Sequence, residues 1–498
     1  MVEPWIIVTA ISLVFSIPVL VFSYYTVILF LSSLRYPKSL LAEGLPLLSE
    51  RPRVSVLVAT YDEKFVISRT LDALTRLEYP RERLQVIVAD DSTDETVAII
   101  DQKINELNSL GINARVSRRE NRDGFKSGAL NHAAPLLNGD YTLLLDADSS
   151  VTPSILSRGL SAFRVDPKIG FVSFRVGHYN REQNLITKLF ALQQDQGDTI
   201  SKMGAYAINA PFSYQGGFTL ISTPLLRKVG LWTNNSIVDD ADISCKVYSA
   251  GWKGVYLSDT KILGEDPQSL EVWKKQATRV AQGWAKCARS NWWRVLTCKN
   301  LSIWRRFGLL MTLLGPFSAL SWIVVTFVSA VALLFGLTAP SSSIFSNPIY
   351  VILVTLPVVA FFISGAYALW VQKIMTGDRL LLLPLISYTS SGLMTAISIG
   401  FLSGISGVHG SFFRTPKTGP EANLATRQYF RDIRLDRNAI AEGVLASVAI
   451  VLSISIIEKG VWLLFLSLLG FGVLTIKSMN ISRLFAKRSS ERGSTNVC

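Results

Sequence analysis

The sequence is poor in charged residues and in cysteine. Charged side chains make up 17% of its 498 residues, whereas hydrophobic side chains make up 49%. This balance favours a chain with a membrane-embedded part. The cysteines show no Cys-x-x-Cys spacing, which argues against a zinc site or a disulfide framework. There are four: Cys245, Cys287, Cys298 and Cys498.

A further absence marks the N-terminus, where no basic residue precedes the first apolar run. Residues 5–33 are almost wholly apolar and long enough to span a bilayer. Basic residues follow them, beginning with Arg35 and Lys38. A cleaved signal peptide has the opposite flanks and a shorter apolar core. We therefore expect a retained anchor over residues 1–34, with the chain beyond it on the cytoplasmic side.

Apolar runs return in the second half of the chain, at 309–337, 347–371, 380–405, 439–457 and 460–478. The segment 406–438 and the tail 481–498 are basic, so both are expected in the cytoplasm. The region between 307 and 405 must then cross the membrane an even number of times. The run 380–405 contains a Ser-Tyr-Thr-Ser-Ser-Gly stretch and is the candidate for an interfacial or re-entrant piece. A transmembrane region over 307–480 follows, with about five spans in the whole chain.

Between the membrane parts, residues 50–278 have the rhythm of a soluble domain. Short β-rich runs alternate with helical patterns, and the predicted strands are Val54–Ala59, Leu84–Ala89, Tyr141–Leu145 and Gly170–Phe174. This alternation predicts a Rossmann-like α/β domain with a mainly parallel sheet.

Residues 279–306 contain seven Lys or Arg residues, four Trp residues and no acid. Basic and aromatic residues together favour an interfacial helix that faces anionic headgroups, and a solvated basic helix is the alternative. The net charge of +13 is also compatible with a nucleic-acid partner. We expect none, because the most basic stretches flank apolar runs, where a bilayer explains them better.

Acidic residues follow three of the predicted strands. The first strand runs into Tyr61-Asp62-Glu63, the second into Asp90-Asp91-Ser92 and the third into Asp146-Ala147-Asp148. In an open α/β sheet the ligand crevice lies beyond the carboxyl ends of the strands. Two carboxylates at positions i and i+2 of a strand point to the same side, so Asp146 and Asp148 favour a hard divalent ion that bridges a diphosphate.

A further acidic cluster, Asp239-Asp240-Ala241-Asp242, follows the segment Gln215-Gly216-Gly217 by about twenty residues. Capping of a helix N-terminus accounts for one of these acids but not for three. Crowded carboxylates raise one another's pKa, which suits a general base. Lys126 lies in a basic, glycine-containing stretch between two carboxylate clusters, which suits a phosphate-bearing ligand.

Taken in order, these residues resemble the membrane-bound glycosyltransferases of family 2, which are related to cellulose synthase, hyaluronan synthase and ceramide glucosyltransferase. The motifs cover about residues 54–284. They are Tyr61-Asp62-Glu63, Asp90-Asp91-Ser92, Lys126 with Gly128-Ala129-Leu130-Asn131, Asp146-Ala147-Asp148, Gln215-Gly216-Gly217, Asp239-Asp240-Ala241-Asp242 and Gln276-Ala277-Thr278-Arg279. The resemblance implies a GT-A fold and a nucleotide-sugar donor, linked to UDP or GDP.

The resemblance also implies a role for each motif residue. On the donor side, Tyr61, Glu63, Asp90 and Asp91 hold the base and ribose, Lys126 lies near the diphosphate, and Asp146 and Asp148 bind Mg²⁺ or Mn²⁺. Asp240 is the catalytic base, and Gln276 and Arg279 contact the diphosphate and the acceptor. The acceptor side further includes Gly216, Gly217, Asp242, Gln282 and Trp284. Phe413, Arg414, Thr415 and Lys417 resemble a gating loop that folds over the nucleotide.

One departure from the family pattern bears on the product. Val280 stands where the family has a Trp that stacks on the acceptor sugar, and Trp284 is a candidate substitute one turn later. Loss of this ring counts against processive synthesis. The resemblance then implies an inverting hexosyltransferase in the plasma membrane that forms a β-glycoside on a membrane lipid or a cell-surface glycan. A processive polysaccharide synthase is the alternative, and a non-catalytic receptor or transporter on the same scaffold is a third hypothesis.

Overall fold

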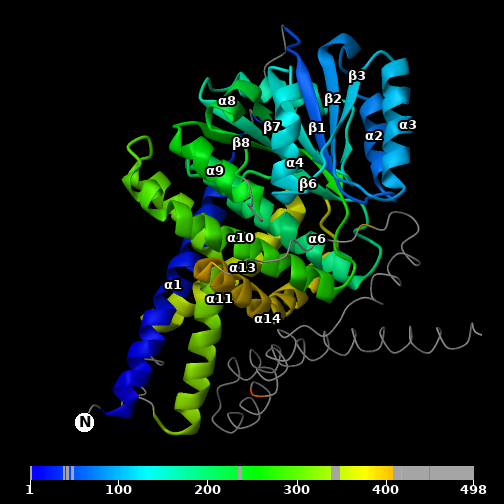
Figure 1. The fold of residues 1–498 in the computed structure, drawn as a ribbon. Coiled ribbons are helices and arrows are strands. Elements are labelled where there is room, and N and C mark those ends of the chain that lie inside the picture. Colours follow the sequence, from blue (N-terminus) through cyan, green and yellow to red (C-terminus); the bar gives the residue numbers. More distant parts are fainter. Residues whose placement is uncertain are drawn as a thin grey trace, which may run out of the picture.

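The computed structural model describes residues 3–37, 40, 44–45, 50–233, 238–337, 348–407, 417 and 448. The expected spans 439–457 and 460–478, the tail 481–498 and the loop residues Phe413, Arg414 and Thr415 lie outside this part. An α/β domain forms one end of the molecule, and long helices extend from it at the other end (Figure 1).

The α/β domain contains one eight-stranded sheet of order β3-β2-β1-β4-β7-β6-β8-β5. The strands are β1 (Val54–Thr60), β2 (Leu84–Asp90), β3 (Asn113–Arg118), β4 (Tyr141–Asp146), β5 (Ser150–Val151), β6 (Ile169–His178), β7 (Phe218–Ser222) and β8 (Lys253–Gly264). Strands β1 to β4 are parallel, β7 runs antiparallel between β4 and β6, and β8 is parallel to β6. The carboxyl ends of β1, β2, β4, β6 and β8 therefore meet at one edge. The prediction of a mainly parallel α/β fold is confirmed.

Alternating side chains of the strands build a core on each face of the sheet. On one face, Val54, Val56 and Val58 of β1 are fully buried in an apolar cluster that includes residues of α2 (Ile67–Thr75), α3 (Thr96–Ser109) and α5 (Ile155–Phe163). On the other face, Leu57 of β1 joins a cluster with residues of α4 (Phe125–Ala133), α8 (Thr223–Lys228) and α9 (Asp239–Ser249). The period of two along β1 thus places helices on both faces.

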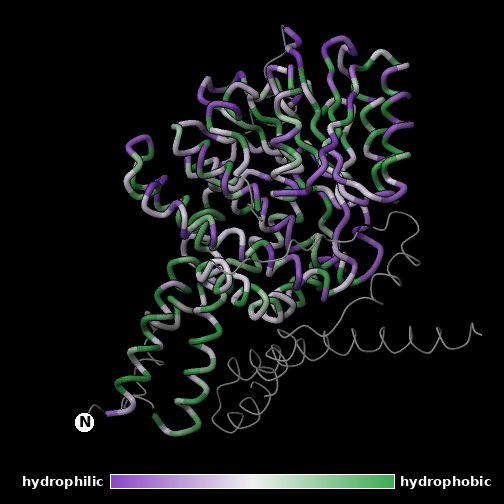
Figure 2. The backbone as a smooth tube through the Cα atoms, viewed as in Figure 1, coloured by the Kyte–Doolittle hydropathy of each residue, from purple (hydrophilic) through white to green (hydrophobic). Residues whose placement is uncertain are grey.

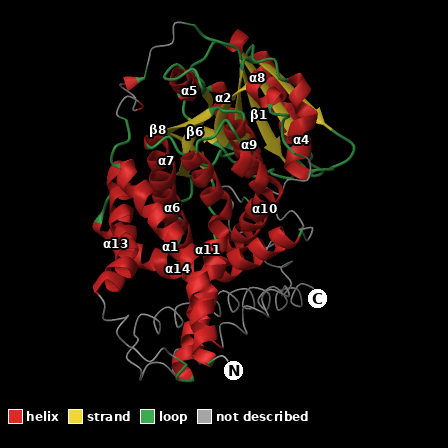
Figure 3. Cartoon of the chain, turned by 90° about the vertical axis from the view of Figure 1, so that its left-hand side faces the viewer, coloured by secondary structure: helices red, strands yellow, loops and turns green. Residues whose placement is uncertain are grey.

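Helices connect this domain to the apolar end of the molecule. They are α1 (Pro4–Ser33), α6 (Leu185–Asp198), α7 (Gly204–Ala207), α10 (Leu270–Thr297), α11 (Ile303–Leu334), α13 (Pro348–Val371) and α14 (Gly377–Ser406). A π-helical turn at Thr199–Met203 joins α6 to α7. Figure 3 shows the sheet at one end and most of these helices gathered below it.

Among the described residues, α1 and the stretch Ile303–Ala332 of α11 are long and apolar enough to cross a membrane. They lie side by side, and both are hydrophobic along most of their length (Figure 2). Helix α14 bends by 40° between Ser387 and Thr389, and its two halves count as a third candidate if taken as one span. Membrane association therefore has a structural basis, whereas the interfacial piece at 380–405 and the number of spans stay predictions.

Helix α10 carries the Gln276-to-Arg279 motif and packs along α14. Two glycines of α14, four residues apart, make this contact possible. A Cβ atom at Gly400 would lie 2.3 Å from the carbonyl oxygen of Thr278, and one at Gly404 would lie 2.4 Å from that of Gln282. Small residues at this spacing let two helix backbones approach closely, so α14 fixes the position of the motif helix.

Candidate active site

A cleft with a volume of about 340 Å³ lies at the edge where the parallel strands end. Most of the predicted site residues line it: Tyr61, Glu63, Asp91, Lys126, Asp146, Asp148, Gly216, Gly217, Asp240, Gln276, Arg279 and Lys417. Segments from residue 59 to residue 417 thus converge at one place, as the strand-end rule predicts.

The two carboxylates that end β4 are each held by a lysine. Lys126 Nζ lies 2.7 Å from Asp146 Oδ1, and Lys417 Nζ lies 2.8 Å from Asp148 Oδ2. Burial lowers the pKa of both lysines, but the neighbouring carboxylates outweigh burial and raise each pKa overall. The backbone N–H of Glu265 also donates to Asp148 Oδ2, at 2.7 Å. The Asp146–Asp148 pair thus attracts positive charge.

Asp240 is the second residue of α9, and its side chain does not cap its own helix. Its Oδ1 atom instead accepts a hydrogen bond of 2.6 Å from the backbone N–H of Gly216. Burial is the largest cause that raises the pKa of Asp240 to about 8, and the charge of Asp239 adds to it. A carboxyl group with this pKa changes protonation near neutral pH, as a general base must.

One end of the cleft is aromatic and positively charged. The Arg122 guanidinium lies 3.3 Å from the centroid of the Tyr61 ring, and Arg119 forms two hydrogen bonds with Asp91, at 2.8 Å and 2.6 Å. Glu63 lines the same cleft. A planar base and a hydroxyl-bearing ribose fit this combination of ring, guanidinium and carboxylates.

The motif on α10 closes another side of the cleft. Burial lowers the pKa of Arg279, and the carboxylates of Asp146, Asp239 and Asp240 lie close enough to oppose that shift. The side-chain carbonyl oxygen of Gln276 is buried and accepts no hydrogen bond from a described residue. Val280 also lines the cleft and is 36% exposed.

Of the predicted site residues that the structure describes, four do not line the cleft. Asp90 accepts from Arg118 Nε at 2.9 Å and from the backbone N–H of Ser92, and Asp242 pairs with Lys246 at 2.8 Å. Trp284 packs against the apolar cluster that includes α9, and Gln282 is buried where α10 meets α14. Each of these side chains has a structural partner, and none lines the cleft, although Asp90 is the last residue of β2.

The cleft also contains residues that the sequence patterns missed. Glu265 and Asp266 follow β8, a strand that was not predicted because Ser258, Asp259 and Thr260 interrupt its apolar pattern. Acids directly after an apolar strand were the signal that could have found them. Phe190 and Gln194 of α6 also line the cleft, and nothing in their local sequence marks them.

The chemistry of the lining fits a hard divalent cation. Eight acidic side chains face the cleft against four basic ones: Glu63, Asp91, Asp146, Asp148, Asp239, Asp240, Glu265 and Asp266 against Arg122, Lys126, Arg279 and Lys417. Within the described part of the chain, no group of three or more His, Cys, Asp or Glu side chains forms a complete metal site. Mg²⁺ and Mn²⁺ suit such a site, because one or two carboxylates hold them together with phosphate oxygens of a substrate.

Comparison with known proteins agrees with this geometry. Residues 52–283 match the model of glycosyltransferase-like family 2. A probable glucomannan 4-beta-mannosyltransferase 1 of Arabidopsis thaliana is 29% identical over 260 residues, which are 51% of this chain and 47% of that protein. A probable glucomannan 4-beta-mannosyltransferase 2 of Oryza sativa subsp. japonica is 27% identical over 267 residues, 53% of this chain and 46% of that protein. The chain therefore matches about half the length of these curated relatives.

Among solved structures, a mannosyltransferase of Pyrobaculum calidifontis in complex with GDP-Man and Mn²⁺ aligns with a TM-score of 0.50 and 19% sequence identity. The alignment covers 80% of this chain and 99% of that one. At this identity the likeness shows the fold, which is the GT-A fold implied by the motifs.

Proposed function

Residues 52–283 belong to glycosyltransferase family 2, and from this we propose that the chain transfers a hexose from a nucleotide sugar to a glycan or lipid acceptor at a membrane. The donor is linked to GDP or UDP, and the product is a β-glycoside formed with inversion. Mannose is our first choice of hexose, because the curated relatives above carry mannosyltransferase names.

One observation carries the proposal: the cleft brings a candidate base, a lysine and a pair of strand-end carboxylates together. Asp240, Lys126 and Asp146 come from three separate elements, and all three line the same cleft. Sugar transfer needs this set, because the acceptor must lose a proton while the leaving diphosphate gains negative charge.

The proposed mechanism is a single displacement. In its ionised form Asp240 takes the proton from an acceptor hydroxyl, whose oxygen attacks the anomeric carbon from the face opposite the diphosphate. The N–H of Gly216 holds the Asp240 carboxyl in place. Lys126 and Arg279 offer positive charge to the departing diphosphate, which both can reach because they line the same cleft.

Asp146 and Asp148 are the residues that would hold Mg²⁺ or Mn²⁺. When bound, the ion supplies Lewis-acid stabilisation of the leaving diphosphate. Lys126 and Lys417, which pair with these carboxylates, would then pair with phosphate oxygens of the donor instead.

The membrane setting follows from α1 and α11. The basic residues after α1 support a cytoplasmic location for the catalytic domain, and a multi-pass protein of the plasma membrane fits both the candidate spans and a lipid or cell-surface acceptor. Exposed Trp292 and Trp293 near the end of α10 fit the interfacial location proposed for residues 279–306.

A processive synthase that moves its polymer through the membrane is the alternative. Lys417, beside Asp148, favours it, because this residue belongs to the segment that resembles a gating loop. Product length decides between the two: addition of one or two sugars rules out the synthase, and long chains support it.

The test is nucleotide release by the purified full-length protein in detergent or lipid. GDP-mannose, UDP-glucose and UDP-N-acetylglucosamine are each incubated with Mg²⁺ or Mn²⁺ and with manno-oligosaccharides or membrane lipids as acceptors. The Asp240→Asn variant serves as the inactive enzyme. Asp166→Asn serves as a matched control, since Asp166 pairs with Lys253 outside the cleft. Equal release by the wild type and Asp240→Asn would refute the proposal.

A further inference from the structure

Asp266 has a carboxylate oxygen that no described residue satisfies. The residue is 5% exposed and lines the cleft, yet its Oδ2 atom is buried without a hydrogen-bond partner. Its Oδ1 atom lies 2.8 Å from Nδ1 of His178. A buried carboxylate oxygen is costly to leave unpaired, so such an atom beside a cleft points to a ligand that completes it.

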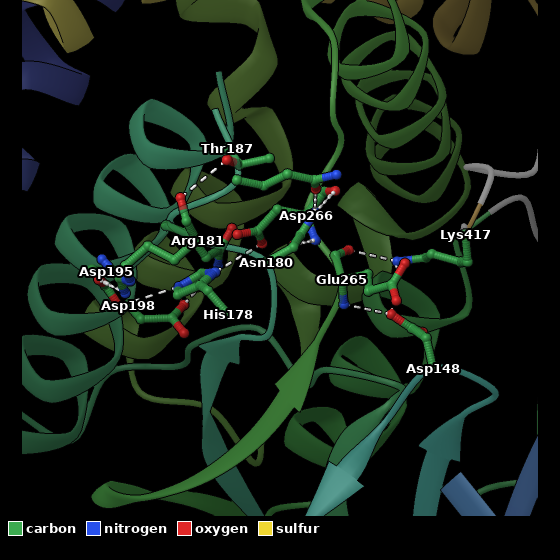
Figure 4. Close-up of polar contacts among 12 residues, drawn as sticks. Asp148, His178, Asn180, Arg181, Thr187, Asp195, Asp198, Glu265, Asp266 and Lys417 are labelled. Atoms are coloured by element: carbon green, nitrogen blue, oxygen red, sulfur yellow. Dashed lines mark hydrogen bonds and ion pairs between the residues drawn. The ribbon is translucent and has the colours of Figure 1, made fainter. Parts of the chain in front are cut away.

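The rest of Asp266 is held firmly (Figure 4). Its backbone N–H donates to Oδ1 of Asn180 at 2.8 Å, and Nδ2 of Asn180 donates to its carbonyl oxygen at 3.1 Å. Together with His178, these contacts fix the backbone and one side-chain oxygen. The remaining oxygen is therefore pre-organised, which lowers the entropic cost of binding a ligand.

The charges around Asp266 identify the chemical class of that ligand. His178 also faces Asp195 Oδ1, at 3.3 Å from Nε2, so both ring nitrogens point at carboxylates. Burial lowers the pKa of His178, but the two carboxylates outweigh burial and raise the pKa overall. An imidazolium donates from both of its nitrogens, so His178 can pair with both acidic side chains. A carboxylate accepts from a neutral hydroxyl and repels a phosphate.

The position of Asp266 along the sheet edge separates it from the nucleotide end. Tyr61 and Asp91 follow β1 and β2, Asp148 follows β4, and Asp266 follows β8, beyond β4 in the strand order. Phe190 of α6 lines the cleft as well. An aromatic ring together with a carboxylate acceptor suits a sugar, which has apolar C–H faces and hydroxyl donors.

We propose that Asp266 binds a hydroxyl group of the acceptor sugar, and that His178 and Asn180 are positioning residues that orient it. This inference rests on the proposed function and deepens it, because it assigns one side of the cleft to the acceptor. It makes Asp266 a determinant of acceptor specificity, distinct from the donor-side residues.

The test compares donor and acceptor kinetics in the full-length enzyme, with GDP-mannose as donor and a manno-oligosaccharide as acceptor. Asp266→Asn keeps the shape of the side chain and leaves an oxygen for His178, but it turns an amide toward the ligand. We expect the acceptor KM to rise about tenfold or more, with the donor KM within about twofold of wild type. Asp259→Asn, which alters an ion pair with Arg158 outside the cleft, should change neither constant.

A second measurement needs no substitution. Acceptors that lack one hydroxyl each are compared on the wild-type enzyme, and at least one should lose about tenfold in kcat/KM. The same analogue should lose no more than about twofold further on Asp266→Asn, since the contact is already gone. His178→Gln should raise the acceptor KM less than Asp266→Asn does.

The outcomes separate this inference from the proposed function. If the wild type transfers no sugar to any acceptor, the proposed function fails. If the wild type transfers sugar and Asp266→Asn has an unchanged acceptor KM, the inference alone is overturned. A rise in the donor KM without a rise in the acceptor KM also overturns it, because the oxygen then belongs to the donor sugar. If Asp266→Asn does not fold, equal rates with all deoxy acceptors overturn the inference on the wild type.

Discussion

Protonation of Asp240 should control the pH dependence of sugar transfer. Its pKa is raised to about 8, chiefly by burial and then by Asp239. At pH 7 about one carboxyl group in ten is then ionised, and at pH 6 about one in a hundred. Because the proposed base acts only when ionised, we expect kcat/KM for the donor to rise about tenfold per pH unit up to about pH 8.

Two neighbours of Asp240 shift its pKa in opposite directions. The negative charge of Asp239 raises the pKa of Asp240, whereas the positive charge of Lys126 lowers it. Asp239→Asn should therefore move the rising limb of the profile to lower pH, and Lys126→Met should move it to higher pH. Removal of Lys126 also removes the proposed phosphate contact. The pH at which the rate rises is therefore informative for this variant, and the maximal rate is not.

The assay is initial-rate nucleotide release at subsaturating donor, from pH 5.5 to 9.5, at constant ionic strength and saturating Mg²⁺. Asp166→Asn, with its substitution outside the cleft, should reproduce the wild-type profile. If both Asp239→Asn and Lys126→Met shift the limb in the same direction, or if neither shifts it, Asp240 is not the group that titrates. A flat wild-type profile would refute the assignment of a base with a raised pKa.

Four further predictions concern other parts of the molecule. Asp148→Asn should weaken Mn²⁺ binding in the presence of nucleotide at least about tenfold in calorimetry, and chelation by EDTA should abolish transfer by the wild type. Gly217→Val should lose activity about a hundredfold with little change in melting temperature, since a Cβ there would lie 2.3 Å from Asp146 Oδ2. Gly404→Leu should destabilise the protein by about 1–3 kcal/mol in thermal unfolding, because it forces α14 away from α10. The pKa of His178 is raised, so its protonated ring stabilises the folded protein fully below the ordinary pKa of 6.5, and this stabilisation is lost as pH rises through the raised value. The melting temperature of His178→Gln should therefore depend less on pH than that of the wild type.

Local sequence was sufficient for much of the fold and for many of the residues that line the cleft. The strands β1, β2 and β4 match their predicted ranges to within a residue at either end, because each is a short, mainly apolar run with acidic residues at its end or just beyond it. The strand-end rule then brings Asp146, Asp148 and Glu63 to one cleft. The strand ranges and the strand-end acids depend on residues close together in the sequence, so they can be predicted from one sequence.

The pairing of the side chains was beyond local reasoning. Lys417 and Asp148 form an ion pair although more than 250 residues separate them in the sequence, and no pattern near either residue predicts this contact. The strand β6 continues to His178, four residues past the predicted end at Phe174, because its neighbour β8 supplies hydrogen bonds where the apolar pattern stops. In the same way, the ion pair between Asp90 and Arg118 depends on the pairing of β2 with β3, which no local pattern shows.

The acceptor side of the cleft departs most from the family pattern. Val280 lines the cleft where the family has a tryptophan, and Trp284 packs against the apolar cluster and does not line the cleft. Phe190 of α6 does line the cleft, and its ring stands 5.3 Å from that of Trp273 in an edge-to-face pair. An aromatic surface for the acceptor is thus available from α6, which packs against α13 and α14. Helix α6 also places Asp195 beside His178, which contacts Asp266. The same helix therefore contributes the aromatic ring, supports the Asp266 side chain and packs against α13 and α14. We expect that a change in the packing of α6 against these helices would alter acceptor binding.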